Sequence, residues 1–180
     1  MPARQTARIP LAPGKSKLKC ERMNIRHARV PDASAICELV NHYAERGRML
    51  HKSLENVYDA LREFIVAENS DGEIVACVAM DVFWADLGEI KSLAVAPQHC
   101  GRGIGKALVE AVIADARSLG VTKLFALTYE KEFFEKLGFR TVDKDMLPEK
   151  VWRECIACPK VDNCDETAVV LALAGRETTA

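Results

Sequence analysis

The chain has 180 residues, of which 49% are hydrophobic and 28% charged, and its net charge is −1. These values are typical of one soluble globular domain that is large enough to bury a core without disulfides or bound metals. The near-neutral charge argues against a strongly basic face for nucleic acid, and no apolar run approaches the ~18 residues of a membrane span. The start also lacks the apolar stretch of ~7 to 15 residues found in secretion signals. We therefore expect a cytoplasmic protein without nucleic-acid or membrane partners.

Residues 1–22 differ in composition from the rest of the chain. Basic side chains outnumber the single acid, Glu21, and prolines interrupt any regular element. This composition predicts a disordered basic leader. An alternative interpretation is a misplaced start codon, with Met23 as the true first residue. In either case residues 23–180 form the predicted domain.

The first half of this domain begins with a strand at 24–30 and a helix at 31–47. Asp32 is available as the helix cap, and apolar residues recur on one face of the helix, namely Ile36, Leu39, Val40 and Tyr43. Ser53 opens a shorter helix. Residues 63–68 and 73–83 read as strands, and the "NSDG" between them is typical of a hairpin turn.

The second half continues the alternation of strands and helices. Strand 89–97 ends in proline, and helix 103–119 ends at Gly120. The remaining elements are a strand at 123–129, a helix at 130–138, and strands at 139–142 and 167–174. The order predicts a mixed α/β fold with an antiparallel meander in its middle.

The segment "QHCGRGIGKALVE", residues 98–110, places three glycines at the start of a helix. Bare backbone N–H groups and the positive end of the helix dipole form a phosphate site there. A Walker loop is excluded because Cys100 stands where its first glycine belongs and Ala107 replaces its hydroxyl residue. A dinucleotide fingerprint fails because Lys106 replaces its third glycine. The pattern Gln/Arg-x-x-Gly-x-Gly/Ala fits.

The segment "SLAVAPQHCGRGIGKALVEAVIADA" resembles the acetyl-coenzyme A loop of the GCN5-related N-acetyltransferases, the GNAT family. The segment "FFEKLGF" (133–139) resembles the second signature of that family. The resemblance covers roughly residues 24–174. It implies a central mixed sheet flanked by helices and acetyl-CoA as co-substrate. A helix-capping glycine turn that binds nothing is the alternative.

The resemblance also implies how the cofactor is held. The pantetheine arm would lie beside strand 89–95, where that strand parts from strand 123–128, and would bond main chain near Leu93 and Val95. Phe134 occupies the position of the family's tyrosine and is assigned to the cofactor site. The residues expected around the pyrophosphate are Gln98, Cys100, Gly101, Arg102, Gly103, Ile104, Gly105 and Lys106.

A further similarity is to the acetyltransferase domain of bacterial N-acetylglutamate synthases. It rests on "GEIKSLAV" (88–95), "LFALTYEKEFFEKLGF" (124–139), "MLHKSLENV" (49–57) and Leu-Pro-Glu at 147–149. This similarity implies acetyl transfer to the α-amine of glutamate, the first step of arginine biosynthesis. With no room in 180 residues for the arginine-sensing kinase domain of those synthases, we expect a short, free-standing form. After residue 149 the sequence departs from their pattern.

Acetyl transfer needs a neutral amine, and an amino group is mostly protonated near pH 7. Glu89 is the candidate general base, and a backbone N–H near Leu93 or Ala94 would stabilise the oxyanion. Phe134 has no hydroxyl, so Thr128 or Tyr129 is the candidate proton donor to the leaving thiolate. Leu50 and Lys52 are the candidate substrate-binding residues, with Arg48 and Lys91 as further cations.

Three of the seven cysteines cluster as Cys155-x-x-Cys158-x5-Cys164. They could ligate zinc or an iron–sulfur cluster, form a redox pair, or remain reduced thiols. Two rival functions also stay open. One is acetylation of another amine, such as a protein N-terminus or lysine, and the other is a non-catalytic sensor of coenzyme A or metal. A homodimer is compatible with such a fold.

Overall fold

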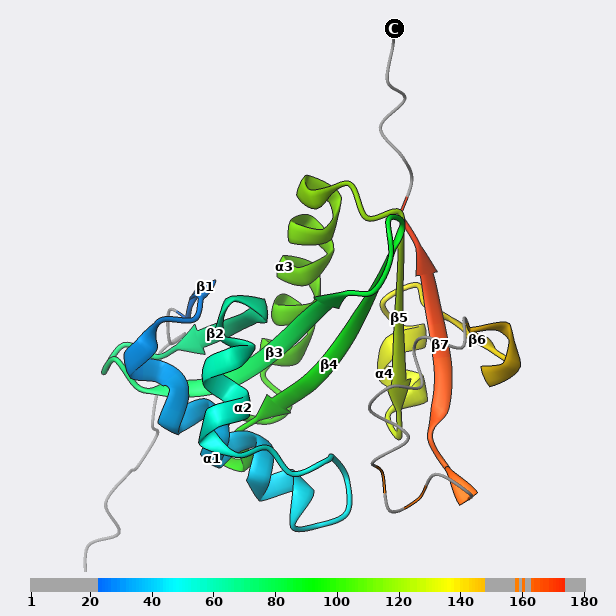
Figure 1. The fold of residues 1–180 in the computed structure, drawn as a ribbon. Coiled ribbons are helices and arrows are strands. Elements are labelled where there is room, and N and C mark those ends of the chain that lie inside the picture. Colours follow the sequence, from blue (N-terminus) through cyan, green and yellow to red (C-terminus); the bar gives the residue numbers. More distant parts are fainter. Residues whose placement is uncertain (1–22, 148–157, 159, 161–162, 174–180) are drawn as a thin grey trace, which may run out of the picture.

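The computed structural model of the chain describes residues 23–147, 158, 160 and 163–173. The predicted leader and Cys155 lie outside these residues. The described strands form one mixed sheet in the order β1-β2-β3-β4-β5-β7-β6, and in it only β4 and β5 pair in parallel (Figure 1). The strands are β1 (Asn24–His27), β2 (Phe64–Glu68), β3 (Ile74–Val82), β4 (Leu87–Val95), β5 (Lys123–Thr128), β6 (Arg140–Val142) and β7 (Thr167–Ala172).

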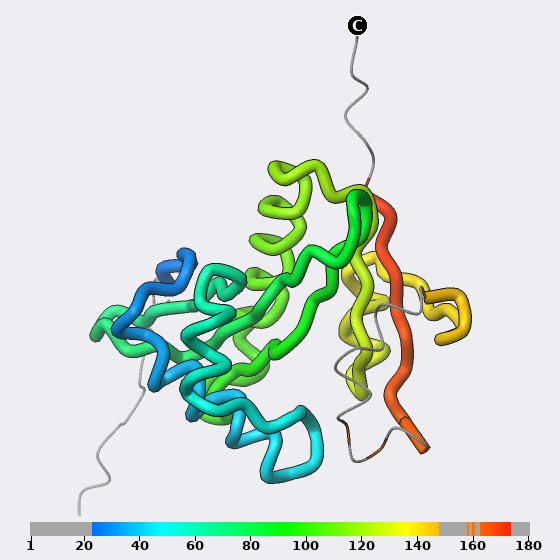
Figure 2. Tube along the Cα trace, in the orientation of Figure 1, coloured from blue at the N-terminus to red at the C-terminus, as the bar shows by residue number. Residues whose placement is uncertain are grey.

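Helices cover both faces of this sheet (Figure 2). The helices α1 (Ala33–Ala44) and α2 (Leu54–Asp59) pack on one face, through a cluster that includes Ile36, Val40 and Val57. The helices α3 (Ile104–Leu119) and α4 (Lys131–Glu135) pack on the other face. The mixed α/β architecture predicted from the sequence is thereby confirmed.

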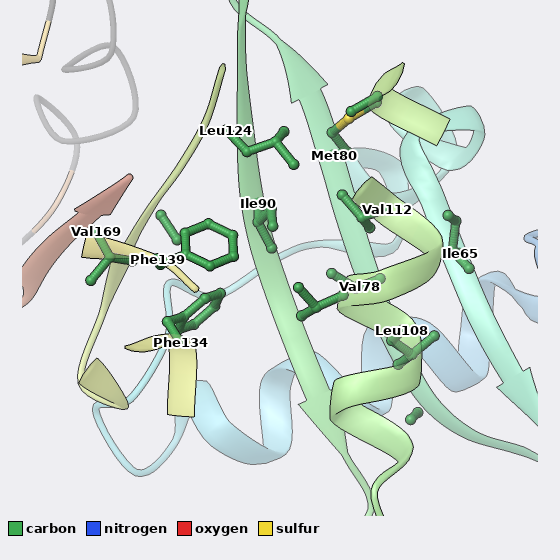
Figure 3. Close-up of a cluster of buried hydrophobic side chains, with 14 of the residues drawn as sticks. Ile65, Val78, Met80, Ile90, Leu108, Val112, Leu124, Phe134, Phe139 and Val169 are labelled. Atoms are coloured by element: carbon green, nitrogen blue, oxygen red, sulfur yellow. The ribbon is translucent and has the colours of Figure 1, made fainter. Parts of the chain in front are cut away.

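The larger core cluster lies between α3 and the sheet (Figure 3). Leu108 and Val112 recur on one side of α3 and are fully buried, as the helical spacing predicts. They face alternate residues of β3, Val78 and Met80, because side chains two apart in a strand share a face. Further along the same layer α4, β7 and the segment before β6 contribute Phe134, Val169 and Phe139.

Most elements are shorter than the sequence predicts. α1 begins at Ala33 because a 3-10 turn, Val30–Asp32, precedes it. β4 keeps its predicted length but begins and ends two residues earlier, at Leu87 and Val95, before another 3-10 turn at Pro97–His99. The predicted hairpin turn is confirmed, with the Gly72 amide donating to the Asn69 carbonyl over 3.1 Å.

The prediction that Asp32 caps the first long helix is wrong. The Asp32 side chain makes no capping hydrogen bond to α1. It accepts instead from the Arg29 amide (2.7 Å) and from Arg26 (2.6 Å), which also binds Glu68 (2.7 Å). Asp32 bonds the Arg26 guanidinium rather than the amides of α1, because a charge-assisted hydrogen bond is stronger. The Asp32 carboxylate is only 8% exposed, so water competes little for it.

The sheet divides into two parts after the start of its parallel pair. β4 and β5 pair only at Leu87–Lys123, Gly88–Leu124 and Glu89–Phe125, and then diverge (Figure 1). On its other side β4 carries an irregularity, where its register with β3 shifts between Cys77 and Ala79. Ser92 lies in this bulge with a φ of 54°. A bulge bends its strand and increases its twist, which turns β4 away from β5.

Asp32→Ala should lower the free energy of unfolding by about 2 kcal/mol, because it leaves the mostly buried Arg26 without its closest partner. Arg26 holds the pKa of Asp32 below its usual range. The stabilisation is therefore present at neutral pH and is lost as pH falls through the depressed pKa. Urea unfolding at pH 7 and pH 3 measures both effects. Glu38→Ala, at an exposed position of α1, is the control and should change stability little.

Candidate active site

The glycine-rich turn connects β4 to α3 at the end where β4 has left β5. Gly101 (φ 75°) and Gly103 (φ 80°) both adopt left-handed backbone, which L side chains rarely occupy. A Cβ built on either glycine would meet nothing within 4 Å. The turn therefore opens onto free space, and its glycines are explained by backbone conformation rather than by crowding inside the protein.

Beyond Gly103 the first amides of α3 point out of the helix without intrahelical partners, as at any helix start. Lys106 is 61% exposed and lies 3.7 Å from Glu110, so its charge is partly balanced. Backbone amides and the helix dipole are thus the principal positive features of this turn. The arrangement is suited to a diphosphate, as the sequence predicts for residues 100–106.

The carbonyl of Val95 marks the end of β4 and is bonded from the α1 side. The Tyr43 hydroxyl donates to it, and the Cys100 thiol lies 3.7 Å from the same oxygen. Burial raises the pKa of Tyr43 to about 12, so its hydroxyl keeps the proton it donates. Val95 is predicted to bond the pantetheine arm through its main chain. Its carbonyl already accepts a hydrogen bond from Tyr43, a side chain that the sequence analysis placed only in the core.

Two neighbouring phenylalanines of α4 have different surroundings. The Phe134 ring is 4% exposed and packs edge-on against Phe133 and Phe139, at centroid distances of 5.2 and 5.1 Å. Phe133 is partly buried, and its ring lies 3.5 Å from where a Cβ on Gly105 would stand. Phe134 accordingly packs in the core, and its contact with the cofactor stays a prediction. Phe133 is the aromatic ring beside the turn.

Glu89 stands at the last paired position before the strands diverge. It lies opposite Asp81 of β3 and beside Phe125 of β5. Lys91 follows two residues later and shares its face of the sheet, the face covered by α1 and α2. Glu89, the candidate base, is therefore next to the edge of β4 that β5 leaves unpaired. It is also directly opposite a second carboxylate residue, Asp81.

Thr128 and Tyr129 lie at the end of β5, across the divergence from β4. Thr128 is 8% exposed, and its Oγ1 accepts from the Glu130 amide over 2.9 Å. A hydroxyl that accepts in this way can still donate its own proton. The Tyr129 hydroxyl donates to Asp165 (2.7 Å) and accepts from Lys160 (2.8 Å). Burial is the main cause that raises the pKa of Tyr129.

Arg48 connects the two diverging parts of the sheet. It lies in the loop after α1, stacks 5.4 Å above the Tyr129 ring and forms an ion pair with Glu130. Arg48 was a candidate cation for the substrate. The structure instead places it in a bridge between the α1–α2 loop and the turn after β5.

A pocket of about 590 Å³ opens on the α1–α2 face of the sheet. It brings together Leu50 and Lys52, the predicted substrate residues, with Lys91 of β4. The side chains that the sequence analysis missed here are Glu63, Asp81 and Phe83. Asp81 carried a readable signal, since it interrupts the apolar run of β3. Glu63 carried none, because a carboxylate before a strand is ordinary in any sequence.

Lys91 is a largely buried cation of this pocket. Its side chain is 14% exposed, and its ammonium lies 3.1 Å from Asp81 and 3.5 Å from Glu63. The sequence names Lys91 only as a further candidate cation for the substrate. Tertiary folding makes it part of the pocket wall, because α2 and the turn before β2 cover that end of β4.

Of the alternatives for the cysteine cluster, the described residues give no support to a zinc or iron–sulfur site. Within them no group of three or more His, Cys, Asp or Glu side chains is arranged to hold a metal. The Cys158 thiol accepts from the Lys160 amide (3.4 Å), and the Cys164 carbonyl accepts from Lys144 (2.8 Å).

Among the described residues, no helix is long and apolar enough to cross a bilayer.

β4 leaves its parallel neighbour β5 and runs into the glycine-rich turn, in a mixed sheet flanked by helices, as the sequence resemblance implies. Residues 33–139 match the family model described as "Acetyltransferase (GNAT) family". The chain belongs to this family.

Relatives refine this assignment. The chain is 42% identical over 132 residues to an amino-acid acetyltransferase of Mycobacterium tuberculosis. The aligned region covers 72% of this chain and 75% of the relative. The chain is 40% identical over 149 residues to an uncharacterized N-acetyltransferase of Chlorobaculum tepidum, which covers 83% of this chain and 96% of that protein. Because the family and the named homologues are acetyltransferases, this chain is an acetyltransferase.

Two solved structures are similar as well. One is N-acetylglutamate synthase from Neisseria gonorrhoeae complexed with coenzyme A and N-acetyl-glutamate, with a TM-score of 0.77 and 34% identity over 84% of this chain. The chain spans only 35% of that synthase. The other is a Mycobacterium tuberculosis protein in complex with CoA and NLQ, with a TM-score of 0.73, 35% identity, and coverage of 83% of this chain and 99% of that one.

Tyr43→Phe should lower the free energy of unfolding by about 1 kcal/mol, since it removes the bond that holds α1 to the Val95 carbonyl. Chemical denaturation measures the change. The matched control is Tyr58→Phe on α2, where the ring is 46% exposed. Equal stabilities of the two variants would contradict a structural role for the Tyr43 hydroxyl.

Proposed function

We propose that this chain transfers the acetyl group of acetyl-CoA to the α-amine of L-glutamate, the first step of arginine biosynthesis. The observation that carries the proposal is the divergence of β4 from β5, after which β4 runs into the turn at Gly101–Gly103. A pocket lined by Leu50, Lys52 and Lys91 lies on the α1–α2 face of the same sheet. The relatives named amino-acid acetyltransferase, and the synthase complexed with coenzyme A and N-acetyl-glutamate, support this acceptor.

The cofactor would use the backbone on both sides of the divergence. The amides of residues 100–105 would hold the pyrophosphate at the start of α3. The pantetheine arm would lie along β4 as an added strand and bond the main chain near Leu93 and Val95. This mode of binding places the thioester near Glu89, where β4 and β5 begin to separate.

The reaction proceeds by direct attack in a ternary complex. Glu89 takes a proton from the α-ammonium, directly or through water. The neutral nitrogen attacks the thioester carbon, and a backbone amide near Leu93 or Ala94 stabilises the oxyanion. When the intermediate collapses, the C–S bond breaks and the thiolate accepts a proton from Thr128 or Tyr129. The nitrogen loses its second proton to solvent, and the donor hydroxyl regains a proton from solvent.

Gly103→Val should weaken binding of coenzyme A at least tenfold, because the new side chain fills the space that the phosphates would occupy. Titration calorimetry measures the affinity. Gly120→Val is the matched control, since Gly120 also has a left-handed φ (85°) and open space around it, but at the other end of α3. If both variants lose affinity equally, backbone strain rather than phosphate contact is the cause.

Glu89→Gln should lower kcat with glutamate by about 100-fold near pH 7, as expected for loss of a general base. The KM for acetyl-CoA should stay near its original value. Release of free thiol, followed across the twenty amino acids, measures turnover and also tests the acceptor. Glu38→Gln on α1 is the control. Unchanged turnover in Glu89→Gln would rule out this base, and turnover with no amino acid would rule out the proposed reaction.

A further inference from the structure

A groove of about 430 Å³ lies between α3 and the turn that follows α4. The described residues that line it come from α3, from that turn and from β7, and not from β4 or β5. Its floor is apolar, because Ile113, Leu137 and Leu171 are partly buried against the core. We call it the α3–α4 groove. Its volume is within the range of pockets that hold small organic ligands.

The rim of the α3–α4 groove is positively charged. Lys106 and Arg117 of α3 and Lys136, which follows α4, are exposed cations on this rim. Glu110 is the single carboxylate among the described lining residues, and it lies 3.7 Å from Lys106. The Lys136 ammonium forms no ion pair with any described residue. A cationic rim over an apolar floor suits a nucleotide, whose phosphate is anionic and whose base has two apolar faces.

Lys106 connects the groove to the glycine-rich turn. It stands in the first turn of α3, directly after the residues whose amides are proposed to hold the pyrophosphate. On the side of α4, the Phe133 ring packs beside Gly105, and Lys136 follows three residues later. Coenzyme A carries its thioester arm on one side of the pyrophosphate and a 3′-phosphorylated adenosine on the other. With the arm along β4, the adenosine end leaves the turn next to this groove.

We propose that the α3–α4 groove binds the adenosine end of coenzyme A, and that Lys136 and Lys106 contact its 3′-phosphate. This inference rests on the placement of the pyrophosphate in the proposed function. A phosphomonoester carries a charge of about −1.5 to −2 at pH 7. The two ammonium groups therefore favour coenzyme A over 3′-dephospho-coenzyme A, which has a hydroxyl in its place. Lys136 is thus a specificity-determining residue for the acetyl donor.

Position along α3 separates direct contact from general attraction. Arg117 has the same charge as Lys106 and lines the same groove, but it lies eleven residues later in the helix, about 16 Å along the axis. Salt screens exposed charges over about 8 Å at physiological ionic strength. A phosphate that lies beside Lys106 and Lys136 should therefore be affected little by Arg117.

The experiment measures Kd for coenzyme A and for 3′-dephospho-coenzyme A by titration calorimetry of the full chain, in about 0.15 M salt. The ratio of the two Kd values is the readout. Both ligands share the pyrophosphate and the pantetheine arm, so effects at the turn or along β4 cancel in the ratio. The original protein should prefer coenzyme A by about fivefold or more, as expected for two exposed charge contacts. Lys136→Gln should reduce this preference at least about twofold, and Lys136→Arg should retain it.

Three further variants test the contact. Lys131→Gln is the matched control on α4, where Lys131 is exposed, outside the groove lining and paired with Glu135. It should keep the preference, and so should Arg117→Gln at the far end of the groove. Glu110→Gln should raise the preference, because it removes the carboxylate that competes for Lys106 and repels the phosphate.

The outcomes separate this inference from the proposed function. Equal binding of the two ligands by the original protein, or a preference that survives unchanged in Lys136→Gln, overturns the inference and leaves the proposed function standing. An equal loss in Lys136→Gln and Arg117→Gln would show long-range attraction in place of contact, and would overturn it as well. Binding of neither ligand would refute the proposed function and, with it, this inference.

Discussion

The separation of β4 from β5 is the constraint on which the rest of the site depends. The two strands hold together over only three residue pairs, and the bulge at Ser92 then turns β4 away while β5 continues to pair with β7. A parallel strand normally satisfies both of its edges by pairing. An edge freed inside a sheet offers backbone groups to a ligand, and here that edge runs from Glu89 directly into the glycine-rich turn.

The proposed cofactor site and the proposed acceptor site are built from different chemistry. The turn at Gly101–Gly103 presents backbone amides and a helix dipole, which few side-chain substitutions would alter. The pocket proposed for the acceptor instead gathers side chains from α2, β3, β4 and the loops between them. Members of one family can therefore share a cofactor and differ in their acceptors, because only the second set of contacts changes with side-chain identity.

The two parts of the sheet also remain connected at the open end. Arg48, from the loop after α1, stacks on Tyr129 and pairs with Glu130 beyond the end of β5. On the opposite side of the opening, Tyr43 binds the end of β4 through the Val95 carbonyl. These contacts anchor both rims to α1 and its following loop, so the divergence of the strands does not leave either rim without support.

Local sequence determined the elements, the glycine turn and the position of Glu89, because periodicity, turn chemistry and backbone preference act between near neighbours in the chain. It singled out Leu50, Lys52 and Lys91, which line one pocket, but could not show that Glu63 and Asp81 complete the wall of that pocket. Nor could it show that Phe134 serves the core while Phe133 faces the turn, or that Arg26 takes Asp32 from its helix. These outcomes depend on strand register and on contacts between residues far apart in sequence, which only the folded sheet brings together.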